Sequence, residues 1–284
     1  MTRSTDVAQP ADLRLVGLRR YPVKSCRGDD LDVAEVEPWG LTGDRRWMLV
    51  DPSGEVVTAR EANRLVLITP EITDRGLHLR APGIADLAVE RPEAGPLVDV
   101  EIWDDRLQAR SADPMAADWF SEVLGRPVRL VYLDDPRRRP VNPHDGASDD
   151  TVSLADAYPL LLAAEESLAQ LNSWIADGPR AADGPVPMLR FRPNLVVRGG
   201  RSFAEDSWQR IRVGEVAFRV VKLCDRCVLT SIDPETAIRT KEPLVSLARH
   251  RRWNGKTWFA VNLVPDAPYG SVRVGDPVEV LATR

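Results

Sequence analysis

The cysteines are the residues of this sequence with the clearest capacity for chemistry. Two of them form the motif Cys224-Asp225-Arg226-Cys227, which follows a stretch rich in Val and Phe and is therefore expected in a turn at a sheet edge. A CxxC motif suits half of a zinc site or a redox dithiol. From the residues alone, a functional thiolate and a pair of partly buried structural cysteines are equally well supported.

The rest of the chain gives little support to either generic interpretation. A zinc site needs two further ligands, and the sequence offers only Cys26 and three scattered histidines. A thioredoxin-like motif opens a helix, whereas the β-branched residues at 228–232 predict another strand. Arg226 lies beside Cys227 in the sequence, and a neighbouring cation favours the thiolate that ligates metals, although a surface ion pair is the plainer role for Arg226.

Further polar side chains stand where strands are expected to begin or end. They are Lys24, Ser25, Arg45, Arg192 and Asn194. Arg presents a fork of donors and Lys a compact charge, so together these residues suit a phosphate and a polar heterocycle, although each taken singly is more commonly a solvated surface residue.

One carboxylate also has a position that suits chemistry. Asp156 precedes an apolar run, which is the place of a residue that caps a turn. Beside a metal, the same carboxylate would instead deliver a proton or bind heterocycle nitrogens.

Composition limits the partners and the compartment. The 284 residues carry a net charge of −5, which argues against a nucleic-acid surface. Three cysteines are too few for a disulfide framework and suit a reducing cytoplasm. Residues 1–12 are polar, so they predict a disordered tail and neither a signal peptide nor a membrane anchor.

The elements that must position these residues are mostly short strands bounded by turn residues. Strands are expected at 13–21, 47–50, 55–58, 65–68, 77–79, 98–103, 194–197, 211–213, 216–223, 228–232, 258–264 and 271–281. Helices are expected at 114–124, between an Asp113 cap and Gly125, and at about 164–175. Residues 134–145, rich in Pro and charge, indicate a linker or an ordered active-site loop. The chain is therefore α+β and mainly β.

Six motifs in one order resemble MOSC proteins with an N-terminal β-barrel domain, such as the mitochondrial amidoxime-reducing components and their bacterial counterparts. The motifs are YPVKSC at 21–26, GDRRW at 43–47, TAR at 58–60, FRPN at 191–194, FAEDSW at 203–208 and CDRCVLT at 224–230. The resemblance implies an N-terminal β-barrel-like domain at 13–135 and a MOSC β-barrel domain with a few helices at 136–284.

The same resemblance implies a cofactor and its contacts. The molybdenum cofactor (Mo-molybdopterin) would be bound through its dithiolene and through the second cysteine of the CxxC motif, Cys227. Its pterin and phosphate contacts map onto Lys24, Ser25, Arg45, Arg192 and Asn194, with Asp156, Asp225 and Arg226 beside it. The sequence departs from the family at Asp225, where Ser is frequent, and at Ala237, where glycine commonly follows the Asp-Pro-x-Thr turn.

The activity implied is reduction of small N-hydroxylated compounds, of the amidoxime or N-hydroxy nucleobase type, with Asp156 assisting proton handling. Neither an iron–sulfur cysteine cluster nor a dinucleotide fingerprint is present in the sequence. Electrons are therefore expected from a separate reductase, ferredoxin-like or cytochrome-like protein. We expect a cytoplasmic protein without the membrane segment or the ferredoxin-like domain of some relatives. The alternative is a carrier of sulfur or molybdenum cofactor that does not turn over.

Overall fold

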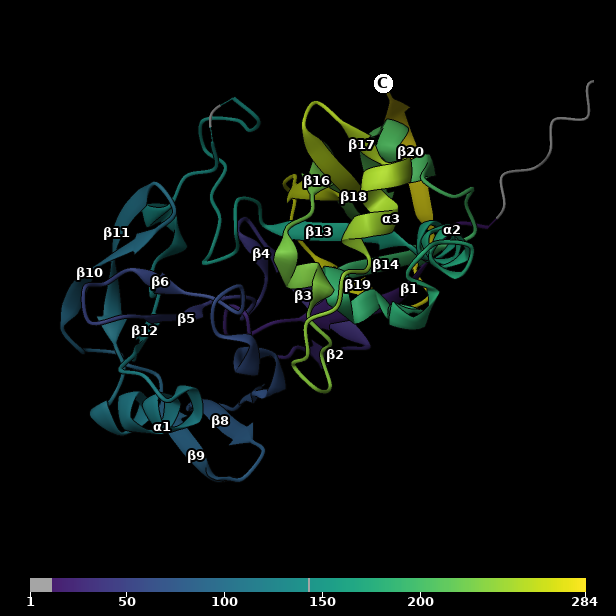
Figure 1. Ribbon diagram of the computed structural model, residues 1–284. Coiled ribbons are helices and arrows are strands. Elements are labelled where there is room, and N and C mark those ends of the chain that lie inside the picture. The colour runs from purple at the N-terminus through teal and green to yellow at the C-terminus, as the bar shows by residue number, and fades with distance from the viewer. Residues whose placement is uncertain (1–11, 143) are drawn as a thin grey trace, which may run out of the picture.

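The computed structural model of the protein describes residues 12–142 and 144–284, so all of the tail expected at residues 1–12 except Asp12 lies outside the described part. Figure 1 shows two lobes. One is formed by the N-terminal, blue to teal part of the chain, and the other by the green to yellow C-terminal part. Strands dominate both lobes, which confirms the α+β, mainly β class.

The larger lobe is built on a nine-stranded sheet with the order β2-β1-β14-β13-β18-β16-β15-β20, to which β17 adds by pairing with β18. Its strands are β1 (Arg14–Arg20), β2 (Asp29–Asp30), β13 (Leu160–Ala164), β14 (Leu195–Arg198), β15 (Trp208–Val213), β16 (Val216–Asp225), β17 (Arg252–Trp253), β18 (Lys256–Pro265) and β20 (Val278–Thr283). Its core includes Leu18, Leu195 and Phe218, all nearly inaccessible to solvent.

The smaller sheets have fewer and shorter strands. The five-stranded sheet has the order β10-β11-β12-β5-β6, and two three-stranded sheets have the orders β19-β3-β4 and β7-β8-β9. Their strands are β3 (Val33–Glu37), β4 (Gly40–Leu41), β5 (Trp47–Val50), β6 (Val56–Val57), β7 (Thr69–Ile72), β8 (Gly76–Ala81), β9 (Ile84–Glu90), β10 (Leu97–Ile102), β11 (Asp105–Ser111), β12 (Arg129–Tyr132) and β19 (Ser271–Arg273).

The helices follow local sequence signals unevenly. α1 (Pro114–Leu124) has the expected bounds, because the Asp113 carboxylate accepts the Met115 N–H at 2.8 Å and Gly125 ends the helix at φ 67°. α2 (Glu165–Ala176) also confirms its prediction. α3 (Leu244–His250) was not predicted, since the residue before it, Pro243, offers no side-chain cap.

Two expected strands are wrong. Residues 65–67 belong to the 3₁₀ turn η1 (Asn63–Leu67), and residues 228–231 form the 3₁₀ turn η6 (Val228–Ser231); Ile68 and Ile232 are the residues that end these turns. The N–H of Ile68 donates to the Leu65 carbonyl, and the N–H of Ile232 donates to the Leu229 carbonyl. A short buried apolar run has no periodicity that separates a strand from a helical turn, so sequence pattern could not decide these segments.

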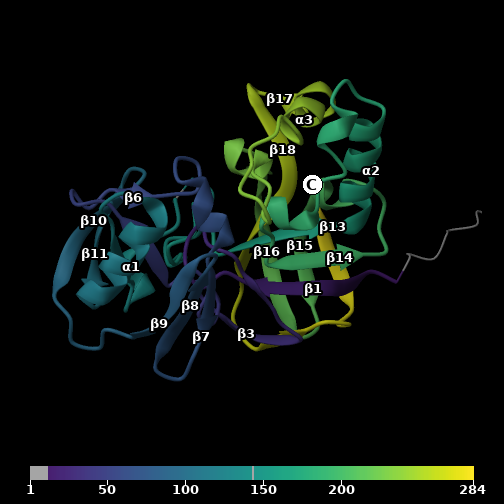
Figure 2. The same cartoon turned by 60° about the horizontal axis from the view of Figure 1, so that its bottom comes forward.

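The first strand belongs to the larger lobe. β1 runs beside β14, with Arg14 opposite Arg198, and Figure 2 shows it crossing beneath the C-terminal strands. The N–H of Leu15 also donates to the Asp276 carbonyl at 2.9 Å. The division at residues 135 and 136 remains a prediction. In the part of the chain that the structure describes, no helix is long and apolar enough to cross a membrane.

Candidate functional site

The residues proposed for cofactor binding and catalysis lie around one cavity of about 260 Å³. All nine line it: Lys24, Ser25, Arg45, Asp156, Arg192, Asn194, Asp225, Arg226 and Cys227. The first three come from the segment between β1 and β5, and the last three from the end of β16 and the turn after it. Residues distant in sequence are therefore brought to one place, and Arg60, Phe191 and Cys224 join them.

The floor of the cavity, which we define as Asp44, Arg45, Arg192 and Asn194 with Tyr21 beneath them, is a buried polar network. The Asp44 side chain is inaccessible to solvent, and its carboxylate accepts the Tyr21 N–H at 2.8 Å and the Asn194 amide at 3.1 Å. Arg45 pairs with Asp44 at 2.6 Å and donates to Asn194 Oδ1 at 2.8 Å. Nearly every polar atom here has a partner, so the network is rigid.

The backbone that lines the cavity is strained at three places. Ser25, Arg45 and Arg192 have φ values of 71°, 45° and 57°, in the left-handed region that residues with a Cβ rarely adopt. None of them is glycine, so sequence gives no sign of this conformation. Strained residues of this kind gather at functional sites because the surrounding contacts hold them there.

The Arg192 guanidinium can form more hydrogen bonds than it makes with the described residues. Its Nη1 donates to the Cys26 carbonyl at 2.7 Å, while its Nη2 is buried without a hydrogen-bond partner among the described residues. Burial lowers the pKa of Arg192 to about 10, and the Tyr21 ring lies 4.2 Å from its guanidinium carbon. An unpartnered guanidinium donor at the cavity floor fits an anionic or polar group on a ligand.

The rim, which we define as Lys24, Arg60, Asp156 and Cys227, is more exposed. Asp156 accepts from Lys24 Nζ at 2.5 Å and from Arg60 Nη2 at 2.8 Å, and its side chain is 56% exposed. Desolvation opposes ionisation of Asp156, but Lys24 and Arg60 outweigh it and hold the pKa of this carboxyl well below its usual range. Burial lowers the pKa of Lys24 to about 8, against the opposing effect of Asp156.

The two thiols of the CxxC motif have different cationic partners. Arg226 was expected beside Cys227, but its Nη1 lies 2.7 Å from Cys224 Sγ and its Nη2 donates to the Phe191 carbonyl. Cys227 Sγ instead lies 3.2 Å from Nε of Arg60. Burial raises the pKa of Cys224. The cation beside Cys227 therefore comes from the TAR motif at 58–60, some 170 residues earlier, and Arg60 was not among the expected site residues.

The backbone of Asp156 is held by a second arginine that sequence reasoning missed. Arg139 is 2% exposed, and it donates to the Ala155 carbonyl at 2.5 Å and the Asp156 carbonyl at 2.9 Å. Its Nε also donates at 2.8 Å to Asp105, the first residue of β11. This part of the stretch at 134–145 is therefore an ordered loop that fixes the backbone of Asp156.

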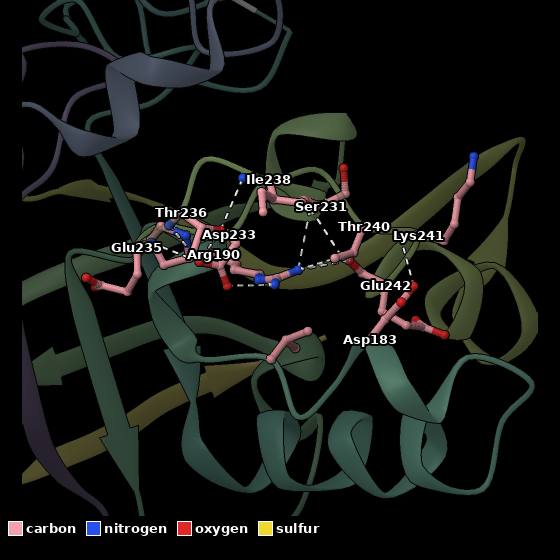
Figure 3. A network of polar contacts seen from close by, with 12 residues as sticks. Asp183, Arg190, Ser231, Asp233, Glu235, Thr236, Ile238, Thr240, Lys241 and Glu242 are labelled. Carbon is pink, nitrogen blue, oxygen red and sulfur yellow. Dashed lines mark hydrogen bonds and ion pairs between the residues drawn. The ribbon is translucent and has the colours of Figure 1, made fainter.

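A third arginine holds the chain that follows Cys227. In the network of Figure 3, Arg190 of the 3₁₀ turn η4 (Met188–Phe191) donates to Thr240 Oγ1 at 2.9 Å and to the Glu242 carbonyl at 3.2 Å. It also pairs with Asp233 at 3.1 Å. Because η4 leads directly into Arg192, the network ties the loop after η6 to the cavity floor.

The donor set fits a metal that arrives with most of its ligands. Within residues 12–142 and 144–284, no group of three or more His, Cys, Asp or Glu side chains is placed to hold a metal ion. The cavity offers the thiol of Cys227, five Lys or Arg side chains against Asp156 and Asp225, and buried unpartnered nitrogens on Arg192 and Arg226. A metal held by one protein thiolate and by an anionic organic ligand suits this arrangement.

Comparison with known proteins gives matches along most of the chain. Residues 12–127 match the MOSC N-terminal beta barrel domain, and residues 149–279 match the MOSC domain. Mitochondrial amidoxime-reducing component 1 of Homo sapiens is 34% identical, covering 92% of this chain and 81% of that protein. Mitochondrial amidoxime reducing component 2 of Bos taurus is 32% identical, covering 91% and 80%. Molybdenum cofactor sulfurase of Oryza sativa subsp. japonica is 32% identical over 89% of this chain, but only over 32% of that protein.

Proposed function

Because this chain belongs to the family of MOSC proteins with an N-terminal beta barrel domain, we propose that it binds the molybdenum cofactor and reduces N-hydroxylated compounds. One observation carries the proposal. A single cavity combines the Cys227 thiol, in contact with Arg60, and the unpartnered buried nitrogens of Arg192 and Arg226. These are the groups needed to hold a metal through sulfur and its organic ligand through charge.

Different residues bind different parts of the cofactor. Cys227 ligates the metal, and the Arg60 guanidinium places a cationic hydrogen-bond donor 3.2 Å from the sulfur. Arg192 and Arg45 bind the anionic end of the cofactor, with Lys24, Ser25 and Asn194 beside them. Arg226 and Asp225 form the adjoining wall. When bound, the cofactor supplies the two-electron chemistry that the side chains cannot perform.

The reaction needs electrons and protons from outside the substrate. The N–O bond of an amidoxime breaks and an N–H bond forms, so two electrons and two protons convert each N–OH group to N–H and water. Asp156 is ionised beside Lys24 and Arg60, so its carboxylate accepts a hydrogen bond from a substrate or pterin N–H. This orients the ligand at Asp156 Oδ2 and replaces proton delivery as the role proposed for that residue.

The electrons come from a separate one-electron carrier protein. The sequence contains three cysteines, Cys26, Cys224 and Cys227, and an iron–sulfur cluster of the usual type needs four. Cys26 is fully buried, and burial raises the pKa of its thiol to about 12. We therefore expect no turnover with NADH alone.

A second candidate function is transfer of sulfur or of the cofactor itself. The similarity to a molybdenum cofactor sulfurase favours it, and Cys227 would then carry a persulfide. Metal and sulfur analysis of freshly purified protein separates the two functions. Near-stoichiometric molybdenum supports the reductase, whereas persulfide with exchangeable cofactor supports the carrier.

The decisive variants are Cys227→Ser and Cys224→Ser. We expect Cys227→Ser to lose molybdenum and activity, because the thiolate ligand is removed, and Cys224→Ser to retain most of both. Turnover is measured anaerobically with reduced viologen and a panel of N-hydroxylated amidines and nucleobase analogues, using protein of known molybdenum content. Equal losses in the two variants would indicate a paired dithiol. An inactive but fully loaded wild type would favour the carrier, and turnover with NADH alone would overturn the need for a partner.

A further inference from the structure

A second hollow reaches Cys227 from another side. This groove, of about 380 Å³, is lined by Leu244 and Ala248 of α3, by Arg252, Gly255, Lys256 and Thr257 of the β17–β18 hairpin, and by residues 225–228. It shares only Asp225, Arg226 and Cys227 with the cofactor cavity. The segment that carries the proposed metal ligand is therefore the wall between the two hollows.

The segment at 238–256, which contributes most of the residues that line this groove, is basic although the whole chain is acidic. Residues 238–256 contain six Lys or Arg side chains, and their single acid, Glu242, is fully buried. Glu242 is also occupied by Ser246, which donates to it through both its N–H and its hydroxyl at 3.0 Å. No acidic side chain of this segment is therefore available to balance its charge.

Three of these cations are exposed and have neither an ion pair nor a side-chain hydrogen bond within the described chain: Lys241, Arg249 and Arg252. Arg239 is also exposed and without an ion pair, but its guanidinium donates to the Arg60 carbonyl and to Asn63. Trp253, which is 38% exposed, and Ile238, which is 63% exposed, add apolar area. We call the first three cations and these two apolar side chains the basic face. An apolar centre with charged neighbours is the usual composition of a protein-binding surface.

The basic face is presented by ordered backbone. Asn254 and Gly255 have φ values of 51° and 74°, which suit a tight two-residue turn between β17 and β18. Figure 3 shows Lys241 extending away from the Arg190 network, which holds its neighbours Thr240 and Glu242, while its own N–H donates to Asp183 at 3.0 Å. Little conformational entropy is lost when such a surface binds a partner.

We propose that the basic face is the docking site of an acidic one-electron carrier protein, which delivers electrons through the wall formed by residues 225–227. The proposal rests on the proposed reductase function. A partner in this groove reaches the Cys227 segment without entering the cavity that takes the substrate. Two electrons arrive in successive encounters, so the complex must form and separate quickly, and charge complementarity raises the association rate without requiring tight binding.

The first test measures binding without turnover. An acidic [2Fe–2S] ferredoxin is titrated by calorimetry into the wild type and into the Arg249→Glu/Arg252→Glu double variant. We expect the dissociation constant to rise roughly tenfold or more in the variant and with added salt, since exposed charges are screened over about 10 Å at 0.1 M. Arg91→Glu, at an exposed and unpaired arginine after β9, is the matched control and should leave binding unchanged. Absence of binding to wild type, or an equal effect of Arg91→Glu, would overturn the docking site.

The second test separates docking from chemistry. With the reduced ferredoxin as donor, the double variant should show at least a fivefold lower kcat/KM at low salt, whereas its rate with reduced viologen should match wild type. Equal ferredoxin-driven rates would refute the docking site and leave the reductase function standing. A wild type that is inactive with viologen would refute the reductase function. The calorimetric result alone would then decide whether the basic face is a docking site. A basic cytochrome that binds as tightly as the ferredoxin would contradict charge recognition.

Discussion

The floor and the rim of the cavity both contain carboxylates paired with cations, but the two groups differ in how far solvent reaches them. At the floor, Asp44 and Arg45 form an ion pair that is almost closed to solvent, and Asn194 fills the remaining hydrogen bonds. At the rim, Asp156 meets Lys24 and Arg60 while remaining half exposed. The floor keeps one geometry, because moving any member leaves a buried charge unpaired. The rim can exchange partners with water or a ligand.

This difference shows why a cofactor site benefits from two kinds of polar contact. A tightly bound anion needs donors that are already in place, since reorganising them would use up binding energy. A substrate that enters and leaves at every turnover needs contacts that break and form again at a small cost in free energy. Stability measurements should therefore respond most to the floor, and turnover should respond most to the rim.

The largest expected effect is that of removing the carboxylate at the floor. Asp44→Ala leaves the Arg45 guanidinium buried without its acid, and we expect a loss of about 3–5 kcal/mol in the free energy of unfolding. Urea denaturation at pH 7 measures it. Asp156→Ala at the rim should lose less, because Lys24 keeps its bond to the Leu154 carbonyl. Similar losses in the two variants would erase the distinction between floor and rim.

Glu205 is a buried carboxyl group without a contacting cation in the described part of the chain, so the pH dependence of stability tests what the cations of the floor and rim contribute. Glu205 is 0% exposed and accepts from Ser167, and burial raises its pKa to about 7, with Asp206 adding to the effect and Arg251 opposing it. The folded protein therefore holds this proton more tightly than the unfolded chain. Its stabilisation is complete below pH 4.5 and is lost as the pH rises through 7, by about 3 kcal/mol.

The matching variant for this effect is Glu205→Gln, which keeps an acceptor for Ser167 and removes the titration. The free energy of unfolding, measured by urea denaturation between pH 4.5 and 8, should fall less steeply in the variant than in wild type. Parallel pH profiles would show that Glu205 does not hold the proton.

The next effect compares two arginines directly. If the proposed function holds, Arg192→Ala removes a floor contact to the cofactor, and we expect affinity for the cofactor to fall roughly tenfold to a hundredfold, equivalent to about 1.5–3 kcal/mol. Arg60→Ala at the rim should change retention by less than about threefold and instead reduce turnover. Molybdenum content at limiting cofactor measures the first effect, and the viologen-driven rate measures the second. A reversal of the two phenotypes would contradict the assignment of floor and rim.

The smallest expected effect concerns backbone strain outside the cavity. Ala237 has φ 58° in the turn after η6, in the left-handed region that favours glycine. Ala237→Gly should stabilise the protein by about 0.5–1 kcal/mol, because a residue without Cβ adopts this conformation freely. Thermal denaturation measures the gain, and cofactor retention should not change. Destabilisation by this substitution would mean that the turn is not strained.

Sequence predicted the members of the site better than their contacts. Lys24, Arg45 and Cys227 could be selected because residue type and motif order are local properties of the chain, and the structure brings them to one cavity. The contact between Arg60 and Cys227 joins residues in different lobes, and the one between Asp44 and Asn194 spans 150 positions. Nothing in the local pattern marks such pairs.

The same limit explains the errors in secondary structure. Capped helices such as α1 were predicted to the residue, because Asp113 and Gly125 act on their immediate neighbours. The 3₁₀ turns η1 and η6 look like strands because both are short, apolar and buried, and only their tertiary surroundings decide between the two conformations.

The place of β1 in the larger sheet has a consequence for protein synthesis. Arg14 leaves the ribosome early, but its partner Arg198 and the carbonyl of Asp276 follow only when most of the chain has been translated. The nascent N-terminal segment must therefore wait, and Lys24, Ser25 and Arg45 cannot take their places around the cavity until β14 is available. Loading with cofactor is accordingly expected only after β14 and the Cys227 segment have been synthesised. A fragment that starts at residue 136 would expose an unpaired edge of β14, where aggregation begins.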